Sequence, residues 1–176
     1  MHVLPRHNRA FTLLEMSVAI VVVAVIAVTV VPAWSSLTST RQAAAAEEVE
    51  RRLVAARSQA VSEGRPVGVY VDPATDSTLN YTISASGGTP SVMTNFDGQA
   101  DSAFLVAATY PGAEITSVVG GSGVGGAQIL WFGFDGSPEL RTSTGTLTGP
   151  WTQDAVITFA GGYQVTVRRR TGTVSR

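Results

Sequence analysis

One acidic residue lies at the start of an apolar segment that is long enough to cross a membrane. Glu15 is the only charged residue between Phe11 and Trp34, and an almost unbroken apolar run follows it. About 20 such residues span the hydrocarbon core of a bilayer as a helix, whereas a lone strand could not satisfy its backbone there. Because a carboxylate near that core costs roughly 2.5–3.5 kcal/mol, we expect Glu15 to have a function and a cationic partner.

No cation inside the segment can pair with Glu15, so the partner has to be created. Cleavage after Ala10 would create one, the new amino group of Phe11, four residues before Glu15. That amine would lie within helical reach on the same chain, or could pair with a neighbouring chain. Arg6 and Arg9 precede the apolar run, which orients the N-terminus to the cytoplasm by the positive-inside rule.

Two other interpretations of this segment stay open. In a secretory signal, the arginines would form the basic region and Val31-Pro32-Ala33 the cleavage site, so that the released chain would begin at Trp34. A plain membrane anchor would need no assembly role. Both interpretations leave Glu15 unexplained, and the sequence continues with a helical pattern after Trp34.

The segment resembles the N-terminus of the type IV pilin-like family, with a short basic leader, then Phe-Thr-Leu-Leu-Glu, then an apolar helix that carries a proline. The resemblance implies that a prepilin peptidase cuts between Ala10 and Phe11 and methylates the new amine of Phe11. It also implies that Glu15 recruits the next subunit by neutralising its N-terminus, and that Pro32 occupies the family's usual proline position. Ala10 departs from the usual glycine, so slower processing is expected.

The distribution of glycine divides the chain. None of the 18 glycines precedes Gly64, so residues 11–63 can form one long helix that is interrupted only at Pro32. We predict a leader at 1–10, a transmembrane or filament-core helix at 11–34, an amphipathic helix at 35–64 and a periplasmic β-rich head at 65–176. The amphipathic half carries one apolar stripe at spacings of three and four, made of Ala46, Val49, Leu53, Ala56 and Ala60.

Two charge pairs are expected on the same helix. Glu47 with Arg51 and Glu48 with Arg52 stand at the i,i+4 spacing in the favourable order. Gly64 is expected to end the helix.

The rest of the chain alternates and turns like an antiparallel β domain. Strands are predicted at 67–71, 79–84, more weakly at 103–110, and at 127–134, with the last one central in its sheet. Residues 155–159 and 163–168 flank Ala160-Gly161-Gly162 as a hairpin. The predicted fold class is therefore α+β and pilin-like, a long N-terminal helix packed on a C-terminal antiparallel β domain.

Composition argues against catalysis. The chain has no cysteine, all 12 basic residues are arginine, and both histidines, His2 and His7, lie in the leader. Without the leader the chain would lack histidine, cysteine and lysine, which removes triads, thiol nucleophiles, Schiff-base chemistry and the usual zinc ligands. We therefore predict no enzyme, no cofactor and no metal site. The chain without its leader would be net acidic, so its overall charge does not indicate a nucleic-acid binder.

Two motifs have ordinary structural interpretations. The segment 121–126 fits the pattern GxGxxG but runs into a predicted strand instead of opening a helix, so a loop or hairpin is expected rather than a phosphate site. Asp72 and Asp76 lack the density of acids that a calcium loop needs, and a turn with solvated aspartates is expected.

The later part of the chain resembles the H-type (GspH/FimT) minor pseudopilins. Phe132 to Gly136 matches that family's Phe-x-x-x-Gly element, whereas Gly172 is followed by Thr173 instead of the arginine of its closing turn. The resemblance implies a structural subunit of the type II secretion pseudopilus, which drives folded proteins across the outer membrane. Its partners would be other major and minor pseudopilins, the prepilin peptidase, the inner membrane and, as further candidates, the secreted proteins.

Four arginines crowd the C-terminus, namely Arg168, Arg169, Arg170 and Arg176. Three interpretations stay open: a charged edge strand that resists aggregation, a contact with another subunit, and a salt-sensitive contact with DNA. Some FimT-type relatives bind DNA through a basic tail, so the alternative function is a FimT-like minor pilin of a type IV pilus, in DNA uptake or adhesion. The net acidity of the chain argues against nucleic acid as a partner.

Overall fold

The computed structural model describes residues 12–83, 88–94, 98–124 and 126–176, without the side chains of residues 29–35 and 123–124. The chain divides into two compact units, Met1–Leu37 and Thr38–Arg176. Helix α1 (Leu13–Glu63) contributes to both units.

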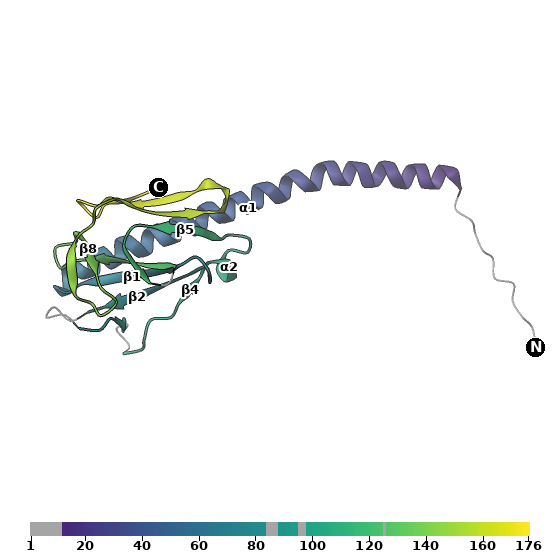
Figure 1. Cartoon of the computed structure of the whole chain (residues 1–176). Coiled ribbons are helices and arrows are strands. Elements are labelled where there is room, and N and C mark those ends of the chain that lie inside the picture. The colour runs from purple at the N-terminus through teal and green to yellow at the C-terminus, as the bar shows by residue number, and fades with distance from the viewer. Residues whose placement is uncertain (1–11, 84–87, 95–97, 125) are drawn as a thin grey trace, which may run out of the picture. The chain divides into compact units, whose positions relative to one another are not determined.

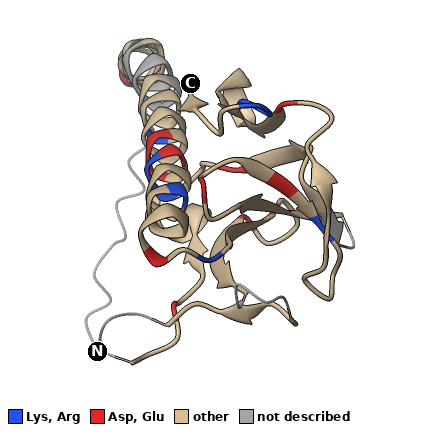
Figure 2. Cartoon of the chain, turned by 90° about the vertical axis from the view of Figure 1, so that its left-hand side faces the viewer, with Lys and Arg blue, Asp and Glu red and all other residues tan. Residues whose placement is uncertain are grey.

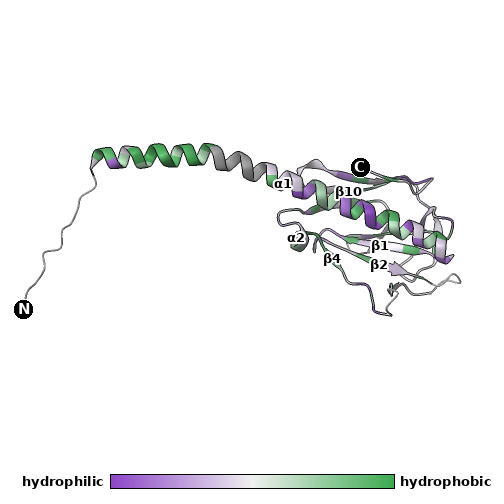
Figure 3. Ribbon diagram, turned by 180° about the vertical axis from the view of Figure 1, so that it is seen from behind, coloured by the Kyte–Doolittle hydropathy of each residue, from purple (hydrophilic) through white to green (hydrophobic). Residues whose placement is uncertain are grey.

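The first part of α1 is apolar on every side (Figure 3). Its large hydrophobic side chains are exposed all round, from Leu13 at 89% to Val28 at 74%. Within the described residues, which leave out side chains 29–35, no helix is long and apolar enough to cross a membrane. Pro32 lies inside α1, and its side chain falls outside the described residues.

The head contains two antiparallel sheets (Figure 1). The larger sheet has the order β3-β2-β1-β7-β8-β9, with β4 pairing with β2 and β6 pairing with β7. Its strands are β1 (Val67–Asp72), β2 (Ser77–Thr82), β3 (Ser91–Val92), β4 (Phe104–Leu105), β6 (Ser122–Val124), β7 (Ala127–Phe132), β8 (Pro138–Arg141) and β9 (Leu147–Pro150). The smaller sheet has the order β12-β11-β10-β5. Its strands are β5 (Ile115–Val119), β10 (Ala155–Phe159), β11 (Gln164–Val167) and β12 (Val174–Ser175).

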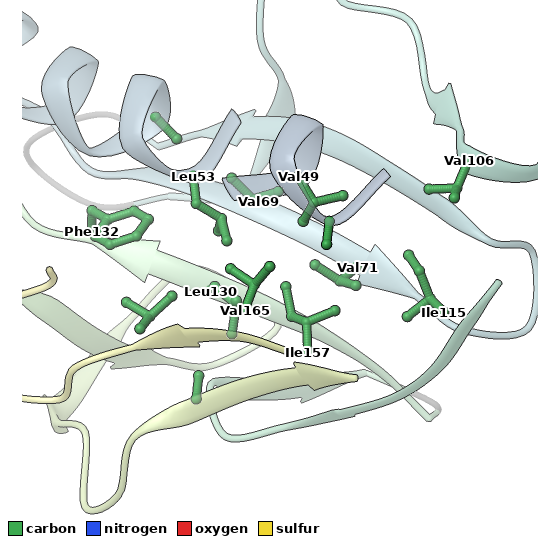
Figure 4. Close-up of a cluster of buried hydrophobic side chains, with 14 of the residues drawn as sticks. Val49, Leu53, Val69, Val71, Val106, Ile115, Leu130, Phe132, Ile157 and Val165 are labelled. Carbon is green, nitrogen blue, oxygen red and sulfur yellow. The ribbon is translucent and has the colours of Figure 1, made fainter. Parts of the chain in front are cut away.

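The second half of α1 and one face of each sheet share a single core (Figure 4). The predicted helix stripe is confirmed, because all five of its side chains are at most 2% exposed. Val69 of β1, Leu130 of β7 and Ile157 of β10 are fully buried in the same cluster. The α+β, pilin-like fold class is therefore confirmed.

A second, smaller cluster covers the opposite face of the larger sheet. It contains Trp131, Ile129 and Ile83, and Tyr70 and Tyr81 pack against it. It lies there because successive side chains of a strand point to opposite faces.

Gly68 explains how the Trp131 ring fits against this sheet. It pairs with Trp131 across β1 and β7, and a Cβ at Gly68 would lie 2.6 Å from the indole. Glycine is therefore required at this position by close approach rather than by a turn.

Most of the predicted strands are present, including the central β7 and the hairpin of β10 and β11 around the 3-10 turn Ala160–Gly162. The prediction of a strand over 103–110 is wrong beyond Leu105, because a single helical turn, α2 (Val106–Thr109), follows β4. The Tyr110 N–H donates to the Val106 carbonyl at 2.8 Å, and the Val106 side chain is fully buried. The backbone thus turns into a helix after Leu105 and places Val106 in the core, instead of continuing as a strand.

The glycine-rich segment and the two aspartates have structural roles. β6 and β7 form the hairpin expected around 121–126. Asp72 accepts hydrogen bonds from Ala74 N and from Thr75 Oγ1, which closes its turn. Asp76 is not simply solvated, because its Oδ1 accepts the Ile115 N–H at 2.7 Å and links the turn to β5.

Candidate functional site

A reciprocal cap starts helix α1. Glu15 Oε2 accepts bonds from Thr12 N at 2.9 Å and from Thr12 Oγ1 at 3.0 Å, and Glu15 N donates back to Thr12 Oγ1 at 3.3 Å. This arrangement is a capping box, in which a threonine and the glutamate three residues later satisfy the free N–H groups of a helix start. Ala10 and Phe11 lie outside the described residues.

The cap gives Glu15 a role within its own chain that sequence reasoning missed. The Thr-x-x-Glu pattern before an apolar run was the available signal. Among the described residues, both Thr12 bonds go to Oε2, and Oε1 accepts none. The carboxylate can therefore cap its helix and still offer one oxygen to a cation.

A second set of residues meets at the other end of α1. Arg57 Nε donates to the Gly136 carbonyl at 3.1 Å, which ties the helix to the turn after β7. A Cβ at Gly172 would lie 2.5 Å from the same carbonyl and 3.1 Å from Arg57 Nε. The Phe-x-x-x-Gly turn and the closing turn at Gly172 are thus neighbours, and Arg57 contacts both. Arg57 was not singled out from the sequence, since its partners are backbone atoms far along the chain.

The arginines 168–170 do not lie on a strand. β11 ends at Val167, and these residues form the turn before β12, so the interpretation as a charged edge strand is wrong for them. Arg168 N donates to the Thr173 carbonyl and Gly172 N to the Arg168 carbonyl, which closes that turn.

Asp154 engages two of these arginines. Its Oδ2 pairs with Arg168 Nη1 at 2.9 Å, and its Oδ1 accepts the Arg169 backbone N–H at 2.8 Å. The hydrogen bond from the Arg169 N–H is the largest cause that holds the pKa of Asp154 below its usual value. The hydrogen bond from the Arg168 side chain is the next largest. Arg169 Nη1 also donates to the Thr152 carbonyl at 2.5 Å.

Arg176 is tied to α1 instead. Its Nε pairs with Glu50 at 2.8 Å, and its Nη1 contacts Glu47 at 3.4 Å. The predicted Glu47–Arg51 pair is therefore wrong, because Glu47 faces Arg176 and Arg51 pairs with Glu48.

The other predicted helix pair is present. Arg52 Nε lies 3.1 Å from Glu48, which thus pairs with two arginines. Acidic and basic residues follow one another along this part of α1 (Figure 2). Three of the four C-terminal arginines thus have different partners: Arg168 binds Asp154, Arg169 binds the Thr152 carbonyl, and Arg176 binds acids of α1. Within the part of the chain that the structure describes, no group of three potential ligands could hold a metal ion.

Two known sequence families match different parts of the chain. Residues 5–31 match the prokaryotic N-terminal methylation motif, and residues 45–171 match the family of type II transport protein GspH. The chain belongs to the GspH family. This match covers the helix stripe, the larger sheet, the smaller sheet without β12, and the turns at Gly136 and Arg168–Arg170.

Two solved structures share the GspH-type fold of this head. Both are of the minor pseudopilin EpsH from the type 2 secretion system of Vibrio cholerae. One has 17% identity and a TM-score of 0.50, over 77% of this chain and 94% of the other. The second has 16% identity and a TM-score of 0.52, over 77% and 92%. No curated protein sequence matches the chain.

Membership of the GspH family identifies the kind of protein. The chain is a structural subunit, a minor pseudopilin, of a type II secretion system, and the FimT-like alternative is not favoured. The family assembles with other pseudopilins. The N-methylation motif and the membership of the GspH family together imply that the chain is a membrane-anchored subunit of a pseudopilus.

Proposed function

We propose that this minor pseudopilin is anchored in the inner membrane by residues 11–34, with a cytoplasmic N-terminus and its head, residues 65–176, in the periplasm. The observation that carries the proposal is the succession of an N-methylation motif at 5–31 and a GspH domain at 45–171. The apolar side chains exposed around the first part of α1 need a bilayer or a filament core to cover them.

A prepilin peptidase removes residues 1–10 and methylates Phe11 in this proposal. Methylation keeps the positive charge of the amine, so Glu15 can still pair with it. The geometry that supports this role is a capped helix start at which Glu15 Oε1 accepts no bond from the described residues. Once the apolar helix packs in the filament core, the buried carboxylate and amine neutralise each other.

In this proposal the protein catalyses no reaction itself. After removal of the leader it would contain no histidine, cysteine or lysine, so only carboxylates, hydroxyls and arginines would remain. Its contribution is mechanical: the pseudopilus pushes folded proteins through an outer-membrane channel, and this head is one of its parts.

An in-frame deletion of the gene tests the secretion role. We expect degradative enzymes to accumulate in the periplasm and to return to the medium when the wild-type gene is restored. A gene for the Glu15→Ala variant serves as the comparison and should fail to restore secretion. Normal secretion by the deletion strain would contradict the proposal, and DNA uptake would then be assayed in that strain.

A further inference from the structure

We propose that the pocket between the Arg169–Arg170 turn and the Pro150–Trp151 corner binds a carboxylate of an acidic peptide segment on a partner protein. The pocket has a volume of ≈ 370 Å³. Its lining residues are Ser137, Pro138, Pro150, Trp151, Arg169 and Arg170. It thus combines walls of proline and tryptophan with two arginines, which suits a glutamate or aspartate beside an aliphatic side chain.

The apolar walls are held in place before any ligand arrives. Trp151 is only 4% exposed, and its indole Nε1 donates to the Glu139 carbonyl at 2.8 Å. Pro138 begins β8 and Pro150 ends β9, and the two strands pair with each other. Because these groups are already fixed, little conformational entropy is lost when a segment docks against them.

Arg170 supplies the unpaired charge of the pocket. It is exposed, and among the described residues its side chain has no hydrogen bond or ion pair. Arg169 is anchored to the Thr152 carbonyl through Nη1, and the other N–H groups of its guanidinium have no partner among the described residues. An arginine fork of this kind binds a carboxylate through two parallel hydrogen bonds.

Among the described residues, neither Asp154 nor Asp135 forms an ion pair with Arg170. Asp154 accepts bonds from Arg168 and from the backbone of Arg169. Asp135 Oδ1 accepts bonds from Ser137 N at 2.9 Å and from Ser137 Oγ at 2.6 Å, and these bonds lower the pKa of Asp135. The pocket therefore keeps a positive charge that an incoming carboxylate can balance.

A protein carboxylate fits this pocket better than nucleic acid. Duplex DNA is bound through a row of phosphate contacts, but Arg168 and Arg176 are occupied by Asp154 and by acids of α1. Arg170, which has no partner among the described residues, the anchored Arg169 and walls of proline and tryptophan form a small site for a single acidic side chain. The site is independent of Glu15, so it can fail while the proposed function holds.

The test measures binding to the full-length protein in detergent micelles by isothermal titration calorimetry. The probe is the capped peptide Gly-Ser-Pro-Glu-Leu-Gly, and its glutamine twin is the control ligand. We expect the glutamate peptide to bind at least about tenfold more tightly than its twin. Arg170→Gln should remove that preference, whereas Arg176→Gln, which deletes the same charge elsewhere, should keep it.

A charge reversal distinguishes a loss of binding caused by the missing charge from one caused by misfolding. Arg170→Glu should prefer a third peptide, with arginine in place of the glutamate, over the original probe. Equal binding of the glutamate and glutamine peptides would overturn the proposal, as would an equal effect of Arg170→Gln and Arg176→Gln. Double-stranded DNA that binds through Arg170 while the peptide does not would also overturn it, in favour of nucleic acid.

Discussion

Glu15 has one role within its own chain and a second, proposed role in the assembly. Within its chain the carboxylate caps α1 through Thr12, and one of its oxygens stays free of described partners. In the proposed assembly that oxygen pairs with an N-terminal amine, on the same chain or on a neighbouring one. The two roles use different oxygens, so they are separable by mutation.

The pair of variants Thr12→Val and Glu15→Ala separates capping from assembly. Thr12→Val removes the two hydroxyl bonds of the cap, at a cost of about 1 kcal/mol at the helix start, and keeps the carboxylate and the bond that it accepts from the Thr12 N–H. We expect it to assemble, whereas Glu15→Ala should insert in membranes as well as wild type or better but assemble poorly. Membrane fractionation and cross-linking between pseudopilin subunits provide the measurement. Normal assembly of Glu15→Ala would refute the pairing role.

The proposed cleavage between Ala10 and Phe11 should depend on the residue before the cut. Ala10→Asp places a charged side chain where the motif has a small one, so the leader should stay attached. Mass spectrometry of the purified protein reads the outcome, with Ala10→Gly as the control that should be processed at least as fast. A product of Ala10→Asp that begins at Phe11 would mean that the motif does not direct cleavage here.

Arg57 has a role that only the packed head shows. Its bond to the Gly136 carbonyl joins α1 to the turn after β7, and the turn at Gly172 lies beside the same carbonyl. Arg57→Met keeps much of the side-chain length and removes the bond, so we expect the head to lose about 1 kcal/mol of unfolding free energy. Arg51→Met is the matched control, because its side chain is 76% exposed and its pair with Glu48 lies on the surface. Urea unfolding of both variants should separate them.

At the scale of the element, α1 has two different halves. The first is apolar all round and exposed, and the second presents one buried stripe to the head. Neighbouring positions on the second half therefore have opposite environments. Leu53 is fully buried, whereas Val54 is 49% exposed.

These two neighbours test the stripe directly. Leu53→Asp buries an unpaired carboxylate and should cost 3 kcal/mol or more, by the ~3–5 kcal/mol that an uncompensated buried charge typically costs. Val54→Asp makes the same chemical change one residue on and should alter the unfolding free energy by no more than about 0.5–1 kcal/mol. Thermal unfolding of the unit 38–176 compares them. A melting curve of Leu53→Asp that matches wild type would show that the stripe is not the core face.

At the scale of the whole molecule, the head is a two-sheet sandwich completed by a helix. Its C-terminal turn is joined to the rest by Asp154, which engages Arg168 and Arg169, and by Arg176, which reaches back to α1. These are surface interactions, and each contributes modestly. Together they connect the last strand to elements far earlier in the chain.

The stability of the head should fall in acid partly through Asp154. Its folded pKa lies below the unfolded value of about 3.9, so its contribution is fully present above that value and is lost as pH falls through the folded pKa. Asp154→Asn should therefore flatten the dependence of unfolding free energy on pH below about pH 4–5. Unfolding curves at several pH values measure this. An unchanged slope in the variant would mean that the aspartate is no better stabilised in the fold than in the unfolded chain.

The sequence by itself determined the features that depend on local pattern. The stripe on α1 follows from helical periodicity, the central strand from its apolar run, and the hairpin around Ala160–Gly162 from its glycines. The N-terminal motif and its candidate residues were also visible, because they form one continuous stretch of chain. These signals are local, so no knowledge of distant contacts is needed to find them.

The tertiary structure decided whatever depends on residues far apart in the chain. In the folded head Glu47 pairs with Arg176 and not with Arg51. Residues 106–109 form a helical turn that places Val106 in the core. The tertiary structure also brought Arg57 to the Gly136 carbonyl and placed Trp151 with Arg169 and Arg170 around one pocket. The physical reason is that hydrogen bonding and packing select partners by distance in space, and the sequence alone gives only distance along the chain.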